Sequence, residues 1–333
     1  METVTHELRL GTRGSQLALW QANTVAARIA AVGGPRCRLV VIKTSGDRLQ
    51  DAPLSDVGGK RLFVKEIEDA LQRHEIDLAV HSSKDMPAAL LDGLTVAAVL
   101  PREDPRDAVV LPAARRLTVG TIDALVAAIG QTPGFGTGSV RRVAQLKRLF
   151  PGARFAPIRG NLDTRLRKLD ERQHDALVLA AAGLRRLGFA DRISLALPTE
   201  GCLPAPGQGI VAVEIREDDE TTRAAVTRID HPPTAAALVA ERELVAALGG
   251  GCQTPVAALA TLTDSGDLEL TAAVIALDGT RIVRASARGP AGEARSIGAR
   301  AAAQLLAAGA DDILADVRRL AAHERSTDDR PTD

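Results

Sequence analysis

The chain has 333 residues, 45% of them hydrophobic and 25% charged, a composition typical of a globular protein with two or three domains. Its 42 basic and 42 acidic residues balance, which argues against a general nucleic-acid-binding protein, because such proteins present a basic surface. The three cysteines form no C-x-x-C pair, and no apolar run is long enough for a membrane span or a secretory signal. We therefore expect a cytoplasmic protein without nucleic-acid or membrane partners, and nothing in the sequence demands more than a monomer.

Short apolar runs alternate with helical patterns through residues 8–100, which predicts a mainly parallel α/β layer structure. In the first helix Ser15 is a candidate N-cap. One apolar face follows from the spacing of Ala18, Ala22, Val25 and Ile29. Strands are expected at 8–12, 38–44, 78–81 and 94–100, and a further helix at 64–74.

A charged segment with two prolines, PREDPRD at 101–107, predicts a domain boundary. The alternation then restarts, and TEGCLPAPGQG at 199–209 is expected to be a second crossing. Two similar lobes joined by two crossings would enclose a cleft for a ligand. The expected elements are strands at 108–111, 134–137, 154–158, 176–180 and 210–215, and helices at 122–129, 140–149 and 162–173.

Beyond residue 231, consecutive strands replace the alternation. A helix is expected at 234–248, and strands near 256–263, 268–277 and 281–288 predict a small antiparallel sheet. Helices at 294–307 and toward residue 320 would cover it. The polar end, 321–333, is expected to be disordered.

Arginines gather where the expected strands end and helices begin. Arg13 follows the first strand, and Arg141 and Arg142 begin a helix after a Gly-rich turn. Arg159 and Arg165 flank the start of the next helix. Ligands of open α/β sheets bind beyond the carboxyl ends of the strands, where helix N-termini also favour anions. One such arginine is more simply a solvated charge, but five favour a carboxylate site, because guanidinium pairs with carboxylate through two parallel hydrogen bonds.

The segment HSSKDMP places Lys84 and Asp85 directly after an expected strand. Asp85 could hold an N–H or ammonium group there and shuttle a proton, a role that contributes about 10²–10⁴ in rate. The sequence leaves open the alternative that Asp85 caps a helix beside a solvated lysine.

Cys252 lies in GGGCQTP, a loop that three glycines leave sterically open. A thiol there could attach a group covalently once its proton is removed. A lone cysteine is more often a small buried hydrophobe, so both possibilities stay open. The chain has no dinucleotide or phosphate-loop signature and no histidine cluster, so neither a nucleotide cofactor nor a metal is expected.

Ten segments, taken in order, resemble the porphobilinogen deaminases, also called hydroxymethylbilane synthases. Together they cover residues 8 to about 290. They are GTRGSQLALWQA (11–22), TSGD (44–47), VGGKRLFVKEIE (57–68), HSSKDMP (81–87), PREDPRDA (101–108), GTGSVRR (136–142), IRGNLDTRLRKLD (158–170), LAAAGLRRLG (179–188), LPAPGQG (203–209) and GGGCQTPVAA (249–258). Each is a weak signal alone, but the ordered set is highly specific.

The resemblance implies an α/β fold with two periplasmic-binding-protein-like lobes around a cleft, plus a small C-terminal α+β domain with an antiparallel sheet. Lobe 1, with the catalytic aspartate, is expected at 1–104 and 208–229. Lobe 2, the arginine-rich side, is expected at 105–207. The domain that carries the cofactor cysteine is expected at 230–320, followed by the tail at 321–333.

The implied reaction joins four porphobilinogens head to tail into hydroxymethylbilane, with loss of four ammonias. It is a transferase reaction of tetrapyrrole and haem biosynthesis. The product grows on a dipyrromethane cofactor that a thioether holds to Cys252. Porphobilinogen is the small-molecule partner that the resemblance implies.

By motif, Asp85 is the implied catalytic residue. The residues implied to bind the cofactor are Cys252, Arg13, Ser15, Lys84, Asp85, Ser139, Arg141, Arg142, Arg159, Arg165 and Gln208. Those implied to bind substrate are Arg13, Gln21, Arg159, Arg165 and Arg186. Lys60 and Phe63 lie in a Gly-rich loop that is expected to cover the cleft.

Two alternatives compete with this interpretation. One is a non-catalytic, two-lobed anion-binding protein, which would gain nothing from the third domain or from Cys252. The other is a cysteine-dependent transferase of another kind, but GGGCQTP contains no histidine to activate the thiol. Bound pyrroles discriminate, because neither alternative predicts them.

Overall fold

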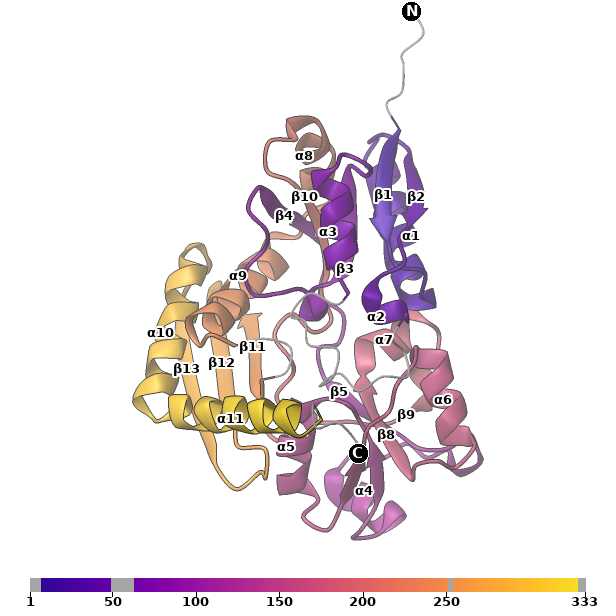
Figure 1. Cartoon of the computed structure of the whole chain (residues 1–333), viewed down its shortest axis with the longest axis vertical. Helices are drawn as coiled ribbons and strands as arrows, with labels where there is room; N and C mark the ends of the chain where they lie inside the picture. Colours follow the sequence, from indigo (N-terminus) through magenta and orange to yellow (C-terminus); the bar gives the residue numbers. More distant parts are fainter. Residues whose placement is uncertain (1–6, 49–62, 251–253, 329–333) are drawn as a thin grey trace, which may run out of the picture.

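Three β-sheets divide the chain into two lobes and a C-terminal domain (Figure 1). The computed structural model describes residues 7–48, 63–250 and 254–328. Each lobe has a five-stranded sheet with helices packed on both faces, and the C-terminal domain has a three-stranded sheet. The two lobes and the antiparallel C-terminal sheet expected from the sequence are confirmed, whereas the residue limits assigned to each domain stay predictions.

The first sheet has the strand order β2-β1-β3-β10-β4. β1 runs parallel to β2 and β3, whereas β10 is antiparallel to β3 and β4. Alternate residues of a strand face opposite sides, so Leu78 and Val80 pack with α1 while Ala79 packs with α3. The strands are β1 (Leu8–Thr12), β2 (Cys37–Val41), β3 (Leu78–Ser82), β4 (Leu94–Val99) and β10 (Val211–Arg216), and the helices of this lobe are α1 (Gln16–Ala31), α2 (Ser45–Arg48), α3 (Lys65–Gln72) and α8 (Glu220–Val226).

The second sheet has the order β7-β6-β8-β5-β9. β6 is parallel to β7 and β8, and β5 is antiparallel to β8 and β9. Val178 packs with α4 and α5 on one face, and Leu177 and Leu179 pack with α6 and α7 on the other. The elements are β5 (Asp107–Val110), β6 (Gly134–Gly136), β7 (Arg154–Ala156), β8 (Ala176–Ala180), β9 (Ile193–Ala196), α4 (Ile122–Ile129), α5 (Val140–Leu149), α6 (Leu162–Asp170) and α7 (Ala181–Arg186).

In each sheet the antiparallel strand is the first one after a crossing between the lobes. β5 follows the crossing at 101–106, and β10 follows the crossing at 197–210. The Glu103 N–H donates to the Gly209 carbonyl at 3.1 Å, and Gln208 Nε2 donates to the Pro105 carbonyl at 2.7 Å. These bonds hold the two crossings side by side.

The helix after β1 begins and ends where its residues dictate. Ser15 Oγ accepts a hydrogen bond from the Ala18 N–H, which confirms the predicted N-cap. The chain leaves the helix at Gly33, whose φ of 71° lies in the left-handed region that glycine adopts without strain. This cap places Arg13 and Ser15 together beyond the carboxyl end of β1.

The C-terminal domain packs α9 (Pro232–Ala247) and α10 (Ala294–Ala307) on one face of its sheet. The antiparallel strands are β11 (Val256–Leu262), β12 (Asp267–Ile275) and β13 (Ile282–Pro290). Leu244, Leu270 and Ile297 are fully buried in this core. The last helix, α11 (Ala310–Asp328), adds Ile313 and Leu314 to the same core.

The other face of this sheet docks on α5 of lobe 2, where Ala144 lies in a shared apolar cluster. Lys147 Nζ and Arg148 Nη1 donate to the carbonyls of Leu277 and Gly279, each at 2.9 Å. A Cβ at Gly279 would lie 2.9 Å from the Ala144 carbonyl oxygen, so the β12–β13 turn needs glycine there. The domain is thus fixed to the helix that carries Arg141 and Arg142.

One carboxylate joins both crossings to the C-terminal domain. Glu241 of α9 is fully buried, and its Oε1 accepts from Arg102 Nη1 at 2.6 Å and from the Ala260 N–H at 2.7 Å. Its Oε2 accepts from the Gly207 N–H at 2.6 Å. Arg102 belongs to the first crossing, Gly207 to the second and Ala260 to β11, so three separate segments depend on one side chain.

The structure differs from the sequence predictions at short elements and at the C-terminus. The sequence does not predict α7, α8 or β9, because these short segments show no clear apolar pattern of their own. α11 extends to Asp328, into the segment 321–333 that was expected to be disordered. Ala321, Ala322, Glu324 and Arg325 are strong helix formers, which explains the continuation. Within the described ranges, no helix is long and apolar enough to cross a membrane.

Candidate active site

A cavity of about 270 Å³ lies between the two lobes, and both lobes form its wall. Lobe 1 contributes the segments that follow β1 and β3, and lobe 2 contributes the beginnings of α5 and α6. This is the position at which open α/β sheets bind ligands. The predicted site residues that line this cavity are Arg13, Ser15, Phe63, Lys84, Asp85, Arg142, Arg159 and Arg165.

Arg13 is held by a carboxylate and an aromatic ring. Its Nη2 lies 2.5 Å from Asp47 Oδ1, and its guanidinium carbon lies 4.4 Å from the centre of the Phe63 ring. The Thr44 hydroxyl also donates to Asp47 at 2.8 Å. Burial alone would raise the pKa of Asp47, but the hydrogen bonds and charge of Arg13 bring it below its ordinary value. Arg13 is therefore oriented before any ligand arrives.

Lys84 and Asp85 lie in η1 (Ser83–Asp85), a single 3-10 turn directly after β3. This turn has no side-chain cap, and the N–H that follows it, from Met86, bonds to the Ser83 carbonyl. The capping alternative for Asp85 is therefore wrong. Burial lowers the pKa of Lys84 to about 8, while the charge of Asp85 opposes the shift.

The second crossing packs closely against η1. Gly207 has a φ of 72°, and a Cβ on it would lie 2.7 Å from Ser83 Oγ and 3.1 Å from the Lys84 nitrogen. Only glycine can approach so closely. The position of Asp85 thus depends on the crossing that Glu241 also binds.

Arg159 and Arg165 are placed by the start of α6. Gly160, with a φ of 105°, turns the chain between β7 and the helix, and Arg165 Nε donates back to the Gly160 carbonyl at 2.7 Å. Burial lowers the pKa of Arg165 to about 10. The neighbouring charges of Arg142 and Arg159 lower it further, and Asp85 opposes them. These shifts indicate closely packed cations with too little counter-charge.

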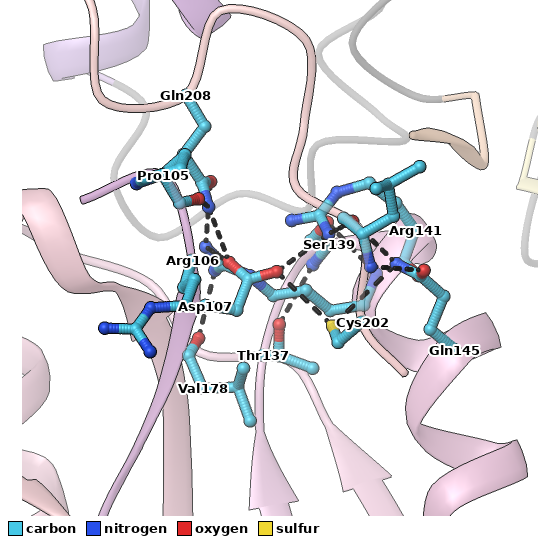
Figure 2. Close-up of polar contacts among 12 residues, drawn as sticks. Pro105, Arg106, Asp107, Thr137, Ser139, Arg141, Gln145, Val178, Cys202 and Gln208 are labelled. Atoms are coloured by element: carbon cyan, nitrogen blue, oxygen red, sulfur yellow. Dashed lines mark hydrogen bonds and ion pairs between the residues drawn. The ribbon is translucent and has the colours of Figure 1, made fainter. Parts of the chain in front are cut away.

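Asp107 holds the two arginines that begin α5, and Figure 2 shows it with Arg141. Arg141 Nη1 donates to Asp107 Oδ2 at 2.7 Å and to the Leu203 carbonyl at 2.7 Å. Arg142 Nε donates to Asp107 Oδ1 at 2.9 Å and its Nη1 to the Val178 carbonyl at 3.0 Å. Burial alone would raise the pKa of Asp107, but the two guanidinium charges lower it far below the ordinary value.

Some predicted residues lie near the larger cavity without lining it. Ser139 caps α5, its Oγ accepting from the Arg142 N–H at 3.4 Å. Gln208 is fully buried and donates to Asp107 Oδ1 at 2.9 Å (Figure 2). Arg141 likewise does not line the larger cavity. The ligand-binding roles of Ser139, Arg141 and Gln208 therefore stay predictions.

Arg186 and Gln21 lie elsewhere around the cleft. Arg186 of α7 donates to the Gly209 carbonyl at 2.7 Å, and its guanidinium carbon lies 5.6 Å from the centre of the Trp20 ring across the lobes. Gln21 of α1 is buried, and its Nε2 donates to Ser82 Oγ at 2.8 Å. Their roles in substrate binding likewise stay predictions.

Other positions were not assigned or are not described. Cys252 and Lys60 lie outside the described residues. Sequence reasoning assigned no role to Asp47, Asp107 or Asp163, although the TSGD, PREDPRDA and RGNLD segments each contain one. No group of three His, Cys, Asp or Glu side chains arranged for a metal occurs in the described part of the chain.

Comparison with known proteins decides the family. Residues 8–224 match the model described as porphobilinogen deaminase, dipyromethane cofactor binding domain, and residues 235–307 match the model of the porphobilinogen deaminase C-terminal domain. This chain belongs to the porphobilinogen deaminase family. Its lobes therefore form the domain that binds the dipyrromethane cofactor, as the resemblance implied.

Curated relatives match almost the whole chain. The porphobilinogen deaminase of Geobacter metallireducens is 48% identical over 313 residues, which cover 93% of this chain and 95% of the relative. That of Syntrophobacter fumaroxidans is 45% identical over 313 residues and covers 94% and 98%. The recognition made from the ten ordered segments is thus confirmed.

Solved structures of two-lobed proteins align with 67% of this chain. The periplasmic VFT2 domain of Bordetella pertussis BvgS is 14% identical, with a TM-score of 0.38 and 86% of that chain covered. The substrate-binding protein AbpA of Streptococcus pneumoniae is 13% identical, with a TM-score of 0.36 and 86% covered. At such TM-scores the architecture rests on the strand orders given above.

Proposed function

We propose that this protein condenses four porphobilinogen molecules head to tail into hydroxymethylbilane, releasing four ammonias, and so acts as a transferase in tetrapyrrole biosynthesis. The observation that carries the proposal is the concentration of cations around Asp85 in one cavity. The cations are Arg13, Lys84, Arg142, Arg159 and Arg165, and the carboxylates that line the same wall are Asp47, Asp85 and Asp163.

The excess of positive charge suits the substrate. Each porphobilinogen ring carries two carboxylates, so a growing chain of rings brings several negative charges into one cleft. Buried cations are costly without counter-charge, and the lowered pKa values of Lys84 and Arg165 express that cost. Anionic ligands therefore supply what the cavity lacks, and guanidinium groups bind them in fixed orientations.

Asp85 is the acid–base group in this proposal. It lies at the end of β3 among cations, where its carboxylate accepts hydrogen bonds from a pyrrole N–H or an ammonium group. It would hold the reacting ring, accept the proton lost when two rings join, and return a proton when one is needed. No second side chain has to be invoked for these steps.

The residues fit the dipyrromethane cofactor for the same reason that they fit the substrate. Arg13, Lys84, Arg142, Arg159 and Arg165 would hold its carboxylates, and Ser15 would add a hydroxyl. When bound, the cofactor supplies the pyrrole carbon to which the first substrate is joined. Its attachment to Cys252 is part of the proposal.

We further propose that the protein is a cytoplasmic monomer. Cys37 and Cys202 are free thiols, which is consistent with a reducing compartment.

The test is the intact mass of the purified protein after incubation with porphobilinogen. We expect a mass excess equal to two porphobilinogens less two ammonias, with hydroxymethylbilane formed, and no excess in Cys252→Ala. Cys37→Ala, a matched variant of a half-buried cysteine, should keep the excess. An unchanged wild-type mass without bilane would overturn the proposal and favour the non-catalytic anion-binding protein.

A further inference from the structure

A second cavity, of about 60 Å³, opens beside the larger one and shares part of its wall. We call it the side recess. It continues between α1 and β3, past residues that the larger cavity does not reach. These deeper residues are Ala18, Gln21, Val64, Val80 and His81, and the shared ones are Arg13, Ser15, Leu17, Phe63, Ser82 and Asp85.

The side recess is too small for a substrate ring. A cavity needs roughly 10–15 Å³ to hold one water molecule, so a recess of about 60 Å³ takes only a few molecules of that size. A pyrrole with its acetate and propionate groups exceeds this volume. Ammonia, which is nearly the size of water, fits.

Three polar groups of the side recess, on Asp85, Ser82 and Gln21, can accept hydrogen bonds. Asp85 contributes a carboxylate at its mouth. Deeper inside, the hydroxyl of Ser82 and the carboxamide of Gln21 bond to each other at 2.8 and 3.2 Å, and both oxygens keep a further lone pair. Ammonia and ammonium are donors, so these groups suit them.

His81, at the deeper end of the side recess, pairs with a buried carboxyl group of β10. Its Nε2 lies 2.9 Å from Oε2 of Glu214, and both side chains are buried. The deeper wall of the side recess thus includes a buried polar pair that contains no lysine or arginine.

The two cavities therefore differ in charge. Among the described residues that line the side recess, Arg13 is the one cation, and Asp47 at 2.5 Å already neutralises it. The larger cavity adds Lys84, Arg142, Arg159 and Arg165. Carboxylates are drawn to the larger cavity, whereas an ammonium ion is repelled from it. Neutral ammonia is held in the side recess by hydrogen bonds to its acceptor oxygens.

We propose that the side recess receives the ammonia that each condensation expels, an inference that rests on the proposed function. When the C–N bond of the substrate's aminomethyl group breaks, both electrons leave with nitrogen, so –NH₃⁺ departs as NH₃ and the positive charge stays on the methylene carbon. Ammonia that remained in contact would add back. Moved beside Asp85, Gln21 and Ser82, it clears the methylene carbon for the next pyrrole.

The first test fills the side recess from α1. Ala18→Val adds two methyl groups to its wall, and Ala27→Val is the matched control on the exposed side of the same helix. We expect Ala18→Val to lower kcat about tenfold with KM changed less than about twofold, because substrate carboxylates bind elsewhere. Inhibition by ammonium chloride, relative to potassium chloride of equal ionic strength, should weaken at least about fivefold. Ala27→Val should match wild type.

A second pair of variants excludes the explanation that Ala18→Val acts by distorting α1 instead of by filling the side recess. Val80→Ile extends a β3 side chain that lines the side recess, and Val213→Ile extends its cross-strand partner in the same core. Val80→Ile should repeat the effect and Val213→Ile should not. Unchanged kcat and ammonium inhibition in both filling variants, or an effect on KM instead of kcat, would overturn the assignment. A wild-type protein that forms no bilane would instead refute the proposed function.

Discussion

Asp85 lies in the wall of both cavities but contributes little to the stability of the fold. It ends a short turn that needs no side-chain cap, and it lines both cavities. We expect Asp85→Ala to fold with a thermal midpoint close to that of wild type but to lose about 10²–10⁴ in kcat, because the acid–base group is gone. Steady-state kinetics and thermal unfolding check this, with the exposed Asp92→Ala as control. Wild-type turnover in Asp85→Ala would exclude the assigned role.

Lys84 should make ligand uptake sensitive to pH. Only the protonated amine attracts a carboxylate, and burial lowers its pKa from 10.5 to about 8. The rate at which cofactor-free protein takes up porphobilinogen, followed by intact mass, should therefore fall as the pH rises through about 8. Lys84→Arg keeps its charge and should move this fall to higher pH. The same profile in both proteins would show that another group titrates.

The residue types of the site could be predicted from the sequence, but not which way each one faces. Arg13, Arg159 and Arg165 do line the cavity, because strand ends and helix starts meet there. Arg141 and Gln208 instead turn toward Asp107, which lies 34 and 101 residues away in the chain. A contact at that separation depends on the fold and leaves no local pattern.

At the scale of elements, α5 depends on the first residue of β5. Asp107 is fully buried and pairs with both Arg141 and Arg142. Asp107→Asn leaves both guanidinium groups without their counter-ion, which should reduce the free energy of unfolding by about 3–5 kcal/mol in urea denaturation. Asp104→Asn weakens the pairs with Arg106 and Arg185, both of them partly exposed, and should cost at most about 1 kcal/mol. Equal losses in the two variants would contradict this.

The same carboxylate should contribute to acid unfolding. The pKa of Asp107 is depressed in the folded state, so its contribution is present above the unfolded value of about 3.9 and is lost as the pH falls below that value. Asp107→Asn should therefore show a weaker dependence of stability on pH below about 4 than wild type. Urea denaturation at pH 3 and at pH 6 measures the difference, and identical slopes would contradict it.

Elements with a clear apolar pattern could be predicted from the sequence, including short strands such as β5 and β6, whereas α7, α8 and β9 could not. The limits expected for α4, α5 and α10 agree with the structure, since eight or more residues display an apolar face. α7 and β9 have six and four residues. α7 packs on the second sheet and β9 pairs with β5 at its edge. Neither contact is present in a local window of the sequence.

At the scale of the whole molecule, Glu241 connects three segments that are far apart in the sequence. Glu241→Gln removes the charge that binds Arg102 and turns an amide donor toward the Arg102 or Gly207 donors. We expect the free energy of unfolding to fall by about 3–5 kcal/mol in urea denaturation. Glu243→Gln on the same helix, whose partner Arg295 is exposed, should change it by less than about 1 kcal/mol. If both variants lost similar free energy of unfolding, the buried pair would stabilise the fold no more than the exposed one.

The ring of Trp20 lies against Arg186, and the chain contains no other tryptophan and no tyrosine. All of its near-ultraviolet emission therefore comes from one indole, placed where α1 of one lobe meets α7 of the other (Figure 1). Any change in the separation of the lobes alters the charge and the water beside that indole. The protein thus carries its own optical probe, which would report any change in the separation of the lobes during turnover without an added dye.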